Sequence, residues 1–243
     1  MHATRKRLPT PFSLLLLLCV APAPAHAQRV ERVSFQTADG VTVAASFFEP
    51  SRRPAPAVIF VHMLTRTRRD WEPVAARLAS EGIAALAIDL RGHGESSPAL
   101  TEESAGPSAM LQDVVAARQY LAGRPDVQHS RIGIAGASLG ANLALVAAAA
   151  DPAVRSIALL SVTLDYRGLR IEQSARKYAP RPMLLVVSRE DAYAHRTLRE
   201  LTKAATAPGR ESLVLDQMGH GTVMLSRDGS IVGTLVDWFH RTL

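Results

Sequence analysis

The chain has 243 residues, of which 47% are hydrophobic and 21% charged, so it is long enough for one domain with a sizeable core and too apolar for a disordered protein. Its formal net charge is +6, and no run of Lys and Arg with interleaved aromatic residues occurs, so nothing indicates a nucleic-acid partner. A single cysteine excludes a disulfide-stabilised framework within the chain.

The first 27 residues have the features of a signal peptide. Basic residues at 5–7 precede an apolar run at 12–21, and Ala25-His26-Ala27 gives the small residues of a cleavage site. This run of about 10 residues is too short to span a bilayer. We therefore expect cleavage before Gln28 and a secreted or periplasmic domain over residues 28–243. After cleavage it would have no stable membrane insertion and no cysteine.

Strand and helix patterns alternate along the rest of the chain. Two strands, 30–36 and 41–47, meet at the Asp39-Gly40 turn. Later strands are almost wholly apolar, which is typical of parallel strands buried on both faces. They are expected at 57–61, 83–88, 131–135, 156–162 and 183–188, with a short last strand at 212–215.

Helices are expected between these strands. Asp70 is a candidate cap for a helix that Gly82 ends, and Pro107 is a candidate first residue for the next helix. Residues 139–150 form an apolar helix, Leu198 and Leu201 share a helix face, and the last helix has a stripe of Ile231, Leu235 and Trp238. The alternation predicts one α/β domain with a mostly parallel sheet covered on both faces. Residues 163–181 have room for a short helix but not for a cap domain.

A pentapeptide at 136–140 places a serine between a predicted strand and a predicted helix. In such a G-x-S-x-G turn, small neighbours allow strained backbone angles, and the Ser138 hydroxyl projects clear of the sheet. The following helix directs its N-terminus at the centre where negative charge develops. This context favours a nucleophile over a glycine turn needed only for packing.

A serine nucleophile needs a base that is oriented by an acid. His220 follows the last predicted strand and has a glycine on each side, whereas a histidine taken alone is more often structural. Asp191 follows the 183–188 strand, so all three residues lie at carboxyl ends of strands. For the acid, Asp165 and Glu190 remain alternatives.

Four segments together resemble the α/β-hydrolase superfamily over residues 30–243. They are Val61-His62, the octapeptide DLRGHGES at 89–96, the turn at 136–140 and Gly219-His220-Gly221. The absence of a cap is similar to lidless esterases and to the dienelactone-hydrolase-like group. That group usually has a cysteine nucleophile, which this chain lacks.

The resemblance implies an oxyanion hole made by the backbone N–H groups of Leu139 and Leu64. It also implies structural or loop-organising roles for His62, Asp89 and His93. Many members have glycine after the histidine, whereas this chain has Met63, whose side chain would narrow or shift the substrate pocket.

Other residues near the expected site have weaker patterns. Arg66, Arg68 and Arg69 would give a cationic rim that favours anionic substrates, or form an ordinary solvated loop. Tyr166 and Tyr193 would line the pocket or simply pack.

We therefore expect a serine hydrolase that cleaves a small carboxylic ester through an acyl-enzyme. A peptidase or an acyltransferase with the same triad is the first alternative, and a non-catalytic binding protein is the second. Neither a metal nor another cofactor is implied, because the sequence has no H-E-x-x-H or paired C-x-x-C spacing.

Overall fold

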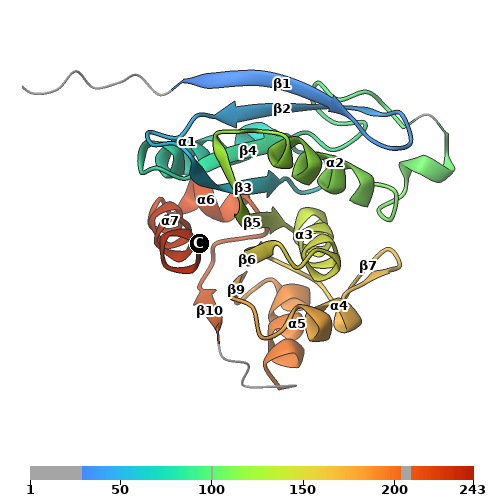
Figure 1. The fold of residues 1–243 in the computed structure, drawn as a ribbon. Coiled ribbons are helices and arrows are strands. Elements are labelled where there is room, and N and C mark those ends of the chain that lie inside the picture. Colours follow the sequence, from blue (N-terminus) through green and yellow to red (C-terminus); the bar gives the residue numbers. More distant parts are fainter. Residues whose placement is uncertain (1–28, 100, 204–208) are drawn as a thin grey trace, which may run out of the picture.

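A computed structural model describes residues 29–99, 101–203 and 209–243. Its main feature is an eight-stranded sheet in the order β1-β2-β4-β3-β5-β6-β9-β10 (Figure 1). Strand β2 pairs antiparallel with both β1 and β4, and the strands from β4 to β10 are parallel. The strand bounds are β1 Val30–Gln36, β2 Thr42–Phe48, β3 Ala55–Val61, β4 Ala84–Ile88, β5 Val127–Ala137, β6 Val154–Leu160, β9 Met183–Ser188 and β10 Arg210–Leu215.

Helices cover both faces of this sheet and divide its core into two clusters. One cluster contains α2, α3, α4 and α5, and the other contains α1 and α7, which lie together on the opposite side (Figure 1). The helix bounds are α1 Glu72–Ser80, α2 Leu111–Ala122, α3 Leu139–Ala150, α4 Glu172–Tyr178, α5 Ala192–Lys203, α6 Val223–Arg227 and α7 Ser230–Thr242. The predicted α/β architecture is confirmed.

The connection between β6 and β9 contains α4 and a two-stranded hairpin, β7 (Asp165–Tyr166) with β8 (Leu169–Arg170). As expected, it holds no cap domain. The hairpin is held by Asn142 of α3, whose side chain accepts from the Thr163 N–H at 3.1 Å and donates to the Thr163 carbonyl at 2.8 Å. Thr197 of α5 also accepts from the Leu164 N–H, at 3.0 Å. These bonds fix the hairpin to the core.

Strand register brings the ends of distant segments to one edge of the sheet. Val61 pairs with Gly136, and Leu160 pairs with both Ala137 and Val186. The residues that follow β3, β5, β6 and β9 therefore meet at the carboxyl edge, where open parallel sheets form their sites.

Several element boundaries differ from the sequence prediction. Asp70 is not a side-chain cap: it lies in a 3-10 turn, Arg68–Trp71, and α1 begins at Glu72. Helix α2 begins at Leu111 rather than at Pro107. The short helix α6 was not predicted. The predicted signal peptide lies outside the described residues, and among those described no helix is long and apolar enough to cross a membrane.

Candidate active site

Ser138 lies at a sharp turn between β5 and α3. Its backbone has φ 51° and ψ −117°, a conformation that costs a non-glycine residue on the order of 1–3 kcal/mol. The residue is 6% exposed, and its side chain makes no capping hydrogen bond to the helix that it precedes. The hydroxyl is thus held at the start of α3 without serving as a helix cap.

The two flanking glycines are required by close packing. A Cβ at Gly136 would overlap the carbonyl group of Gly140 and lie 2.7 Å from the Ala141 nitrogen. A Cβ at Gly140 would lie 2.6 Å from the carbonyl oxygen of His62. The G-x-S-x-G pattern thus lets the start of α3 pack directly on the end of β3.

His220 lies in the loop after β10, with its ring beside a carboxylate from the loop after β9. Its Nδ1 is 2.6 Å from Oδ2 of Asp191. The Asp191 side chain is 9% exposed, and the His220 side chain is 42% exposed. A carboxylate at this distance holds the imidazole with Nδ1 protonated, which leaves Nε2 as an acceptor.

Opposing effects act on the Asp191 carboxyl. Burial favours the neutral form, but hydrogen bonds from His220 and from the Ser161 hydroxyl outweigh it and hold the pKa of Asp191 below its usual value. Asp191 is therefore an anion beside the imidazole at neutral pH.

The other two candidate acids bind different groups. Asp165 Oδ1 accepts from the Gly168 N–H at 2.7 Å, within the β7–β8 turn. Glu190 accepts from Ser188 Oγ at 2.6 Å and from the Gly219 N–H at 2.7 Å. Of the three, only Asp191 bonds the His220 ring among the described residues.

The loop after β3 is ordered by His62. Its Nδ1 donates to the Met63 carbonyl at 2.7 Å, and its Nε2 accepts from the Leu90 N–H at 2.9 Å. Burial lowers the pKa of His62 to about 4, so its ring is neutral.

Two backbone N–H groups beside Ser138 and His62 are the predicted oxyanion donors. Because the C=O and N–H of a trans peptide point in opposite directions and the Met63 carbonyl points to the His62 ring, the Leu64 N–H faces away from His62. Leu139 is the first residue of α3, so its N–H has no carbonyl one turn back.

A cleft of about 510 Å³ contains Ser138, His220 and Asp191 together. Met63, Leu64, Tyr166 and Tyr193, all predicted site residues, line it too, with Thr163, Asp165 and Arg167. Tyr193 is 78% exposed, at the rim. The Met63 side chain packs on Gly221, where a Cβ would lie 2.6 Å from its Sδ.

The arginines after β3 do not line the cleft. Arg66 binds both carboxylate oxygens of Asp70, at 2.8 and 2.9 Å, and Asp70 also accepts from the Thr222 hydroxyl. Arg69 is exposed, and Arg68 is buried. Arg167, which the sequence analysis missed, is the arginine that borders the cleft, and its position on a two-strand hairpin could not be read from its neighbours.

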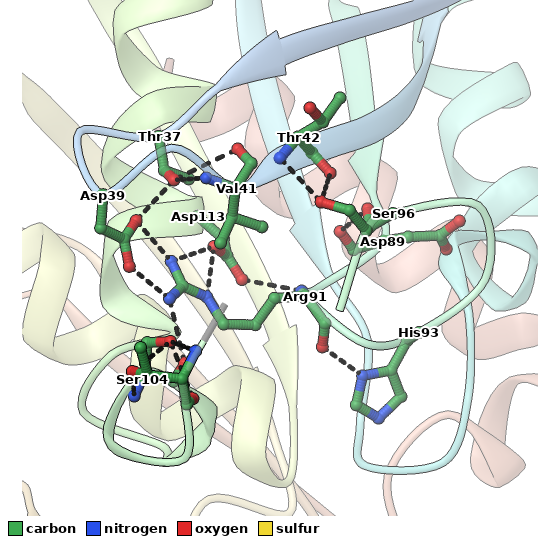
Figure 2. Close-up of polar contacts among 12 residues, drawn as sticks. Thr37, Asp39, Val41, Thr42, Asp89, Arg91, His93, Ser96, Ser104 and Asp113 are labelled. Carbon is green, nitrogen blue, oxygen red and sulfur yellow. Dashed lines mark hydrogen bonds and ion pairs between the residues drawn. The ribbon is translucent and has the colours of Figure 1, made fainter. Parts of the chain in front are cut away.

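Residues of the octapeptide at 89–96 form a network of polar contacts (Figure 2). Arg91 is 1% exposed and binds Asp113 of α2 through Nε at 2.9 Å and Asp39 through Nη1 at 2.6 Å. The His93 ring bonds the Arg91 carbonyl at 2.9 Å and accepts from the Thr65 N–H at 3.3 Å. Arg68 pairs with Asp89. These contacts tie the β1–β2 turn and the β3 loop to the end of β4.

Ser161 is a further residue that the sequence analysis missed. It follows β6 with φ 53°, is fully buried, and its Oγ accepts from the Gly221 N–H at 2.9 Å. Its hydroxyl also bonds Asp191, so it lies between the acid and the backbone next to His220. In the sequence its only signal was a polar residue within the predicted apolar strand 156–162.

The fold and this cleft define an α/β hydrolase. A family model described as serine aminopeptidase, S33, matches residues 52–187, and the chain belongs to this family. The match includes Ser138 and ends before Asp191 and His220.

Curated proteins also resemble the chain in sequence. The chain is 33% identical over 138 residues to the acyltransferase drtE of Aspergillus calidoustus. The matched segment covers 56% of this chain and 44% of the acyltransferase. This chain therefore spans less than half of that relative. It is 27% identical over 208 residues to an uncharacterised protein of Mycobacterium tuberculosis, covering 77% of this chain and 71% of that protein.

Solved structures show the same fold. A dienelactone hydrolase from Anabaena variabilis superposes with a TM-score of 0.70 at 22% identity, covering 90% of this chain and 100% of that one. An esterase from Pyrococcus furiosus superposes with a TM-score of 0.72 at 18% identity, covering 88% and 91%. These likenesses show the fold, and the family match supports a hydrolase.

Proposed function

We propose that the protein is a serine hydrolase that cleaves carboxylic ester bonds with Ser138 as nucleophile, His220 as base and Asp191 as acid. The observation that carries the proposal is that a serine at a strained turn shares one cleft with a histidine whose Nδ1 is 2.6 Å from a carboxylate. A binding protein would not need this combination.

In the proposed reaction, Ser138 Oγ attacks the ester carbonyl and His220 Nε2 takes its proton. The N–H groups of Leu139 and Leu64 would bind the oxyanion, since one begins a helix and the other faces away from His62. His220 then protonates the leaving alcohol. Water attacks the acyl-enzyme with His220 again as base, and Ser138 is released. No step needs a metal or another cofactor, and no group of metal-binding side chains occurs among the described residues.

The cleft supports a small-molecule ester as the substrate. It is open, because the short β7–β8 hairpin stands where a cap domain would, and Tyr166 and Tyr193 border it with apolar Met63 and Leu64. Aromatic rims of this kind bind the apolar part of a ligand. The family description names an aminopeptidase and one relative is an acyltransferase, so amide substrates and alcohol acceptors belong in the test.

Hydrolysis of p-nitrophenyl esters of graded chain length, compared with aminoacyl anilides, tests this proposal. We expect ester turnover to exceed anilide turnover, and added alcohols to leave product release unchanged. Preferential anilide cleavage would make the protein a peptidase, and acyl transfer to the alcohol would make it an acyltransferase.

We also propose that the first 27 residues are a cleaved signal peptide, so N-terminal sequencing of the exported protein should begin at Gln28.

A further inference from the structure

The loop that carries His220 has an irregular backbone. Between β10 and α6, Gln217 has φ 56° and Gly219 has φ 82°, so neither residue continues a strand or a helix. The position of the imidazole therefore depends on side chains that bind this loop. Thr222, which follows Gly221 in this loop, donates a hydrogen bond from its hydroxyl to Asp70.

Two side chains at the end of β9 bind three successive N–H groups of the loop. Glu190 accepts from the Gln217 N–H at 2.9 Å and from the Gly219 N–H at 2.7 Å, one bond to each carboxylate oxygen. Ser188 Oγ accepts from the Met218 N–H at 2.9 Å and donates to Glu190 at 2.6 Å. The N–H groups of the three residues before His220 are thus all bound by a single hydroxyl–carboxylate pair.

We propose that Glu190 is a positioning residue for His220, setting the place of the imidazole by binding the backbone of residues 217 and 219 with its carboxylate. Asp191, the next residue, bonds the imidazole itself. One dipeptide thereby fixes both the loop and the ring of the base. The inference rests on the proposed function, because a positioned base matters only if His220 acts as one.

The charge of Glu190 suits this task. The hydrogen bond from Ser188, with those from Gly219 and Gln217, lowers its pKa to about 2. The carboxylate is therefore ionised throughout the range in which a histidine base works, and charge-assisted bonds to N–H groups are about twice as strong as neutral ones. An amide in its place would turn an NH2 group toward one of the loop N–H donors.

Glu190→Gln tests the proposal, with Asp216→Asn as the matched control. Asp216 lies on the same loop, is exposed, and pairs with Arg189 at 2.7 Å rather than with a loop N–H. Each variant replaces one carboxylate by an amide of the same size. We would measure kcat and KM for an ester substrate, amide hydrogen exchange at residues 217 and 219, and the downfield proton resonance of the carboxylate-bound imidazole N–H.

We expect Glu190→Gln to lower kcat about tenfold, because small misplacement of a catalytic group has effects of this size or larger, with KM within about twofold. Exchange at both amides should quicken, and the imidazole resonance should shift or broaden. Asp216→Asn should leave all three unchanged. Equal losses in both variants would show that only charge matters and would overturn the proposal, as would an unchanged kcat in Glu190→Gln.

Two further measurements keep the test decisive. If Glu190→Gln fails to fold, Glu190→Asp keeps the charge but is one methylene group too short for both N–H bonds, and the same losses are expected. Labelling of Ser138 by a fluorophosphonate is measured in the unmodified protein. If the unmodified protein is labelled but the Glu190 substitution leaves kcat unchanged, only this inference is refuted. If the unmodified protein is not labelled, the proposed function itself is refuted.

Discussion

Gly140 packs against His62 so closely that a Cβ on the glycine would lie 2.6 Å from the histidine's carbonyl oxygen. This contact joins the start of α3 to the loop after β3, which are the two segments proposed to bind the oxyanion. The sequence pattern predicts the glycine, but only the fold shows which backbone it accommodates.

Gly140→Ala should therefore destabilise the protein and misplace the Ser138 turn. The obstacle is backbone, which cannot rotate away, so we expect a loss of about 1–3 kcal/mol in the free energy of unfolding, typical of overpacking. Gly233→Ala in α7 is the control, because a Cβ there meets nothing within 4 Å. That change should stabilise the helix by up to about 1 kcal/mol. Denaturant unfolding of both variants measures the difference, and equal stabilities would contradict the packing account.

Asp191→Asn should leave the protein folded and lower kcat by roughly 10⁴, because an amide stabilises the wrong histidine tautomer. Asp165→Asn should cost less than about tenfold, since its carboxylate binds the β7–β8 turn. Steady-state kinetics on one ester compare the two. If Asp165→Asn lost its activity while Asp191→Asn kept it, the catalytic acid would be Asp165, in the connection after β6.

The buried His62 should make stability fall on acidification. Its pKa is lowered by burial from 6.5 to about 4, so between these values the unfolded chain binds the proton and the folded chain does not. The stabilisation is complete above pH 6.5 and is lost as the pH falls to about 4, by on the order of 3 kcal/mol. Unfolding free energies measured across this range should have a smaller slope in His62→Gln. Parallel slopes would mean that His62 titrates normally.

Arg167 should favour substrates that carry a negative charge. It borders the cleft from a hairpin held by Asn142, and it is exposed. Arg167→Ala should raise KM for a carboxylate-bearing ester about two- to fivefold more than for a neutral one, a typical effect of an exposed charge. Added salt should reduce the difference. Arg69→Ala, outside the cleft, should affect the KM of both esters alike. If Arg69→Ala and not Arg167→Ala selectively raised the KM of the anionic ester, the cationic rim expected from the sequence would be correct.

The sequence was most informative where apolar pattern and burial coincide. Helix α3 has the predicted bounds because an almost wholly apolar run after the serine turn leaves little ambiguity. Strand β5 begins earlier than expected, since residues 128–131 are partly or fully exposed and hide the strand from a search for apolar runs. Asp70 looks like a helix cap locally, but its carboxylate is bound by Arg66 and by Thr222, which is 152 positions away.

Long-range polar contacts account for most of what the sequence did not predict around the site. The order of strands brings Asp191 and His220 to one edge, so strand-end position was enough to nominate them. The backbone contacts of Glu190 depend on left-handed residues at 217 and 219, and no pattern in side chains predicts those φ values. The contacts of Ser161 were equally unpredictable from the sequence, because its partners, Gly221 and Asp191, lie in two other loops.

The most direct test of the central claim is fluorophosphonate labelling and ester turnover of Ser138→Ala beside the unmodified protein. We expect the unmodified protein to be labelled once, on Ser138. The variant should keep its thermal unfolding midpoint, lose the label and lose kcat by on the order of 10⁶. A variant that still takes the label, or keeps more than a few per cent of the turnover, would contradict the assignment of Ser138 as the nucleophile.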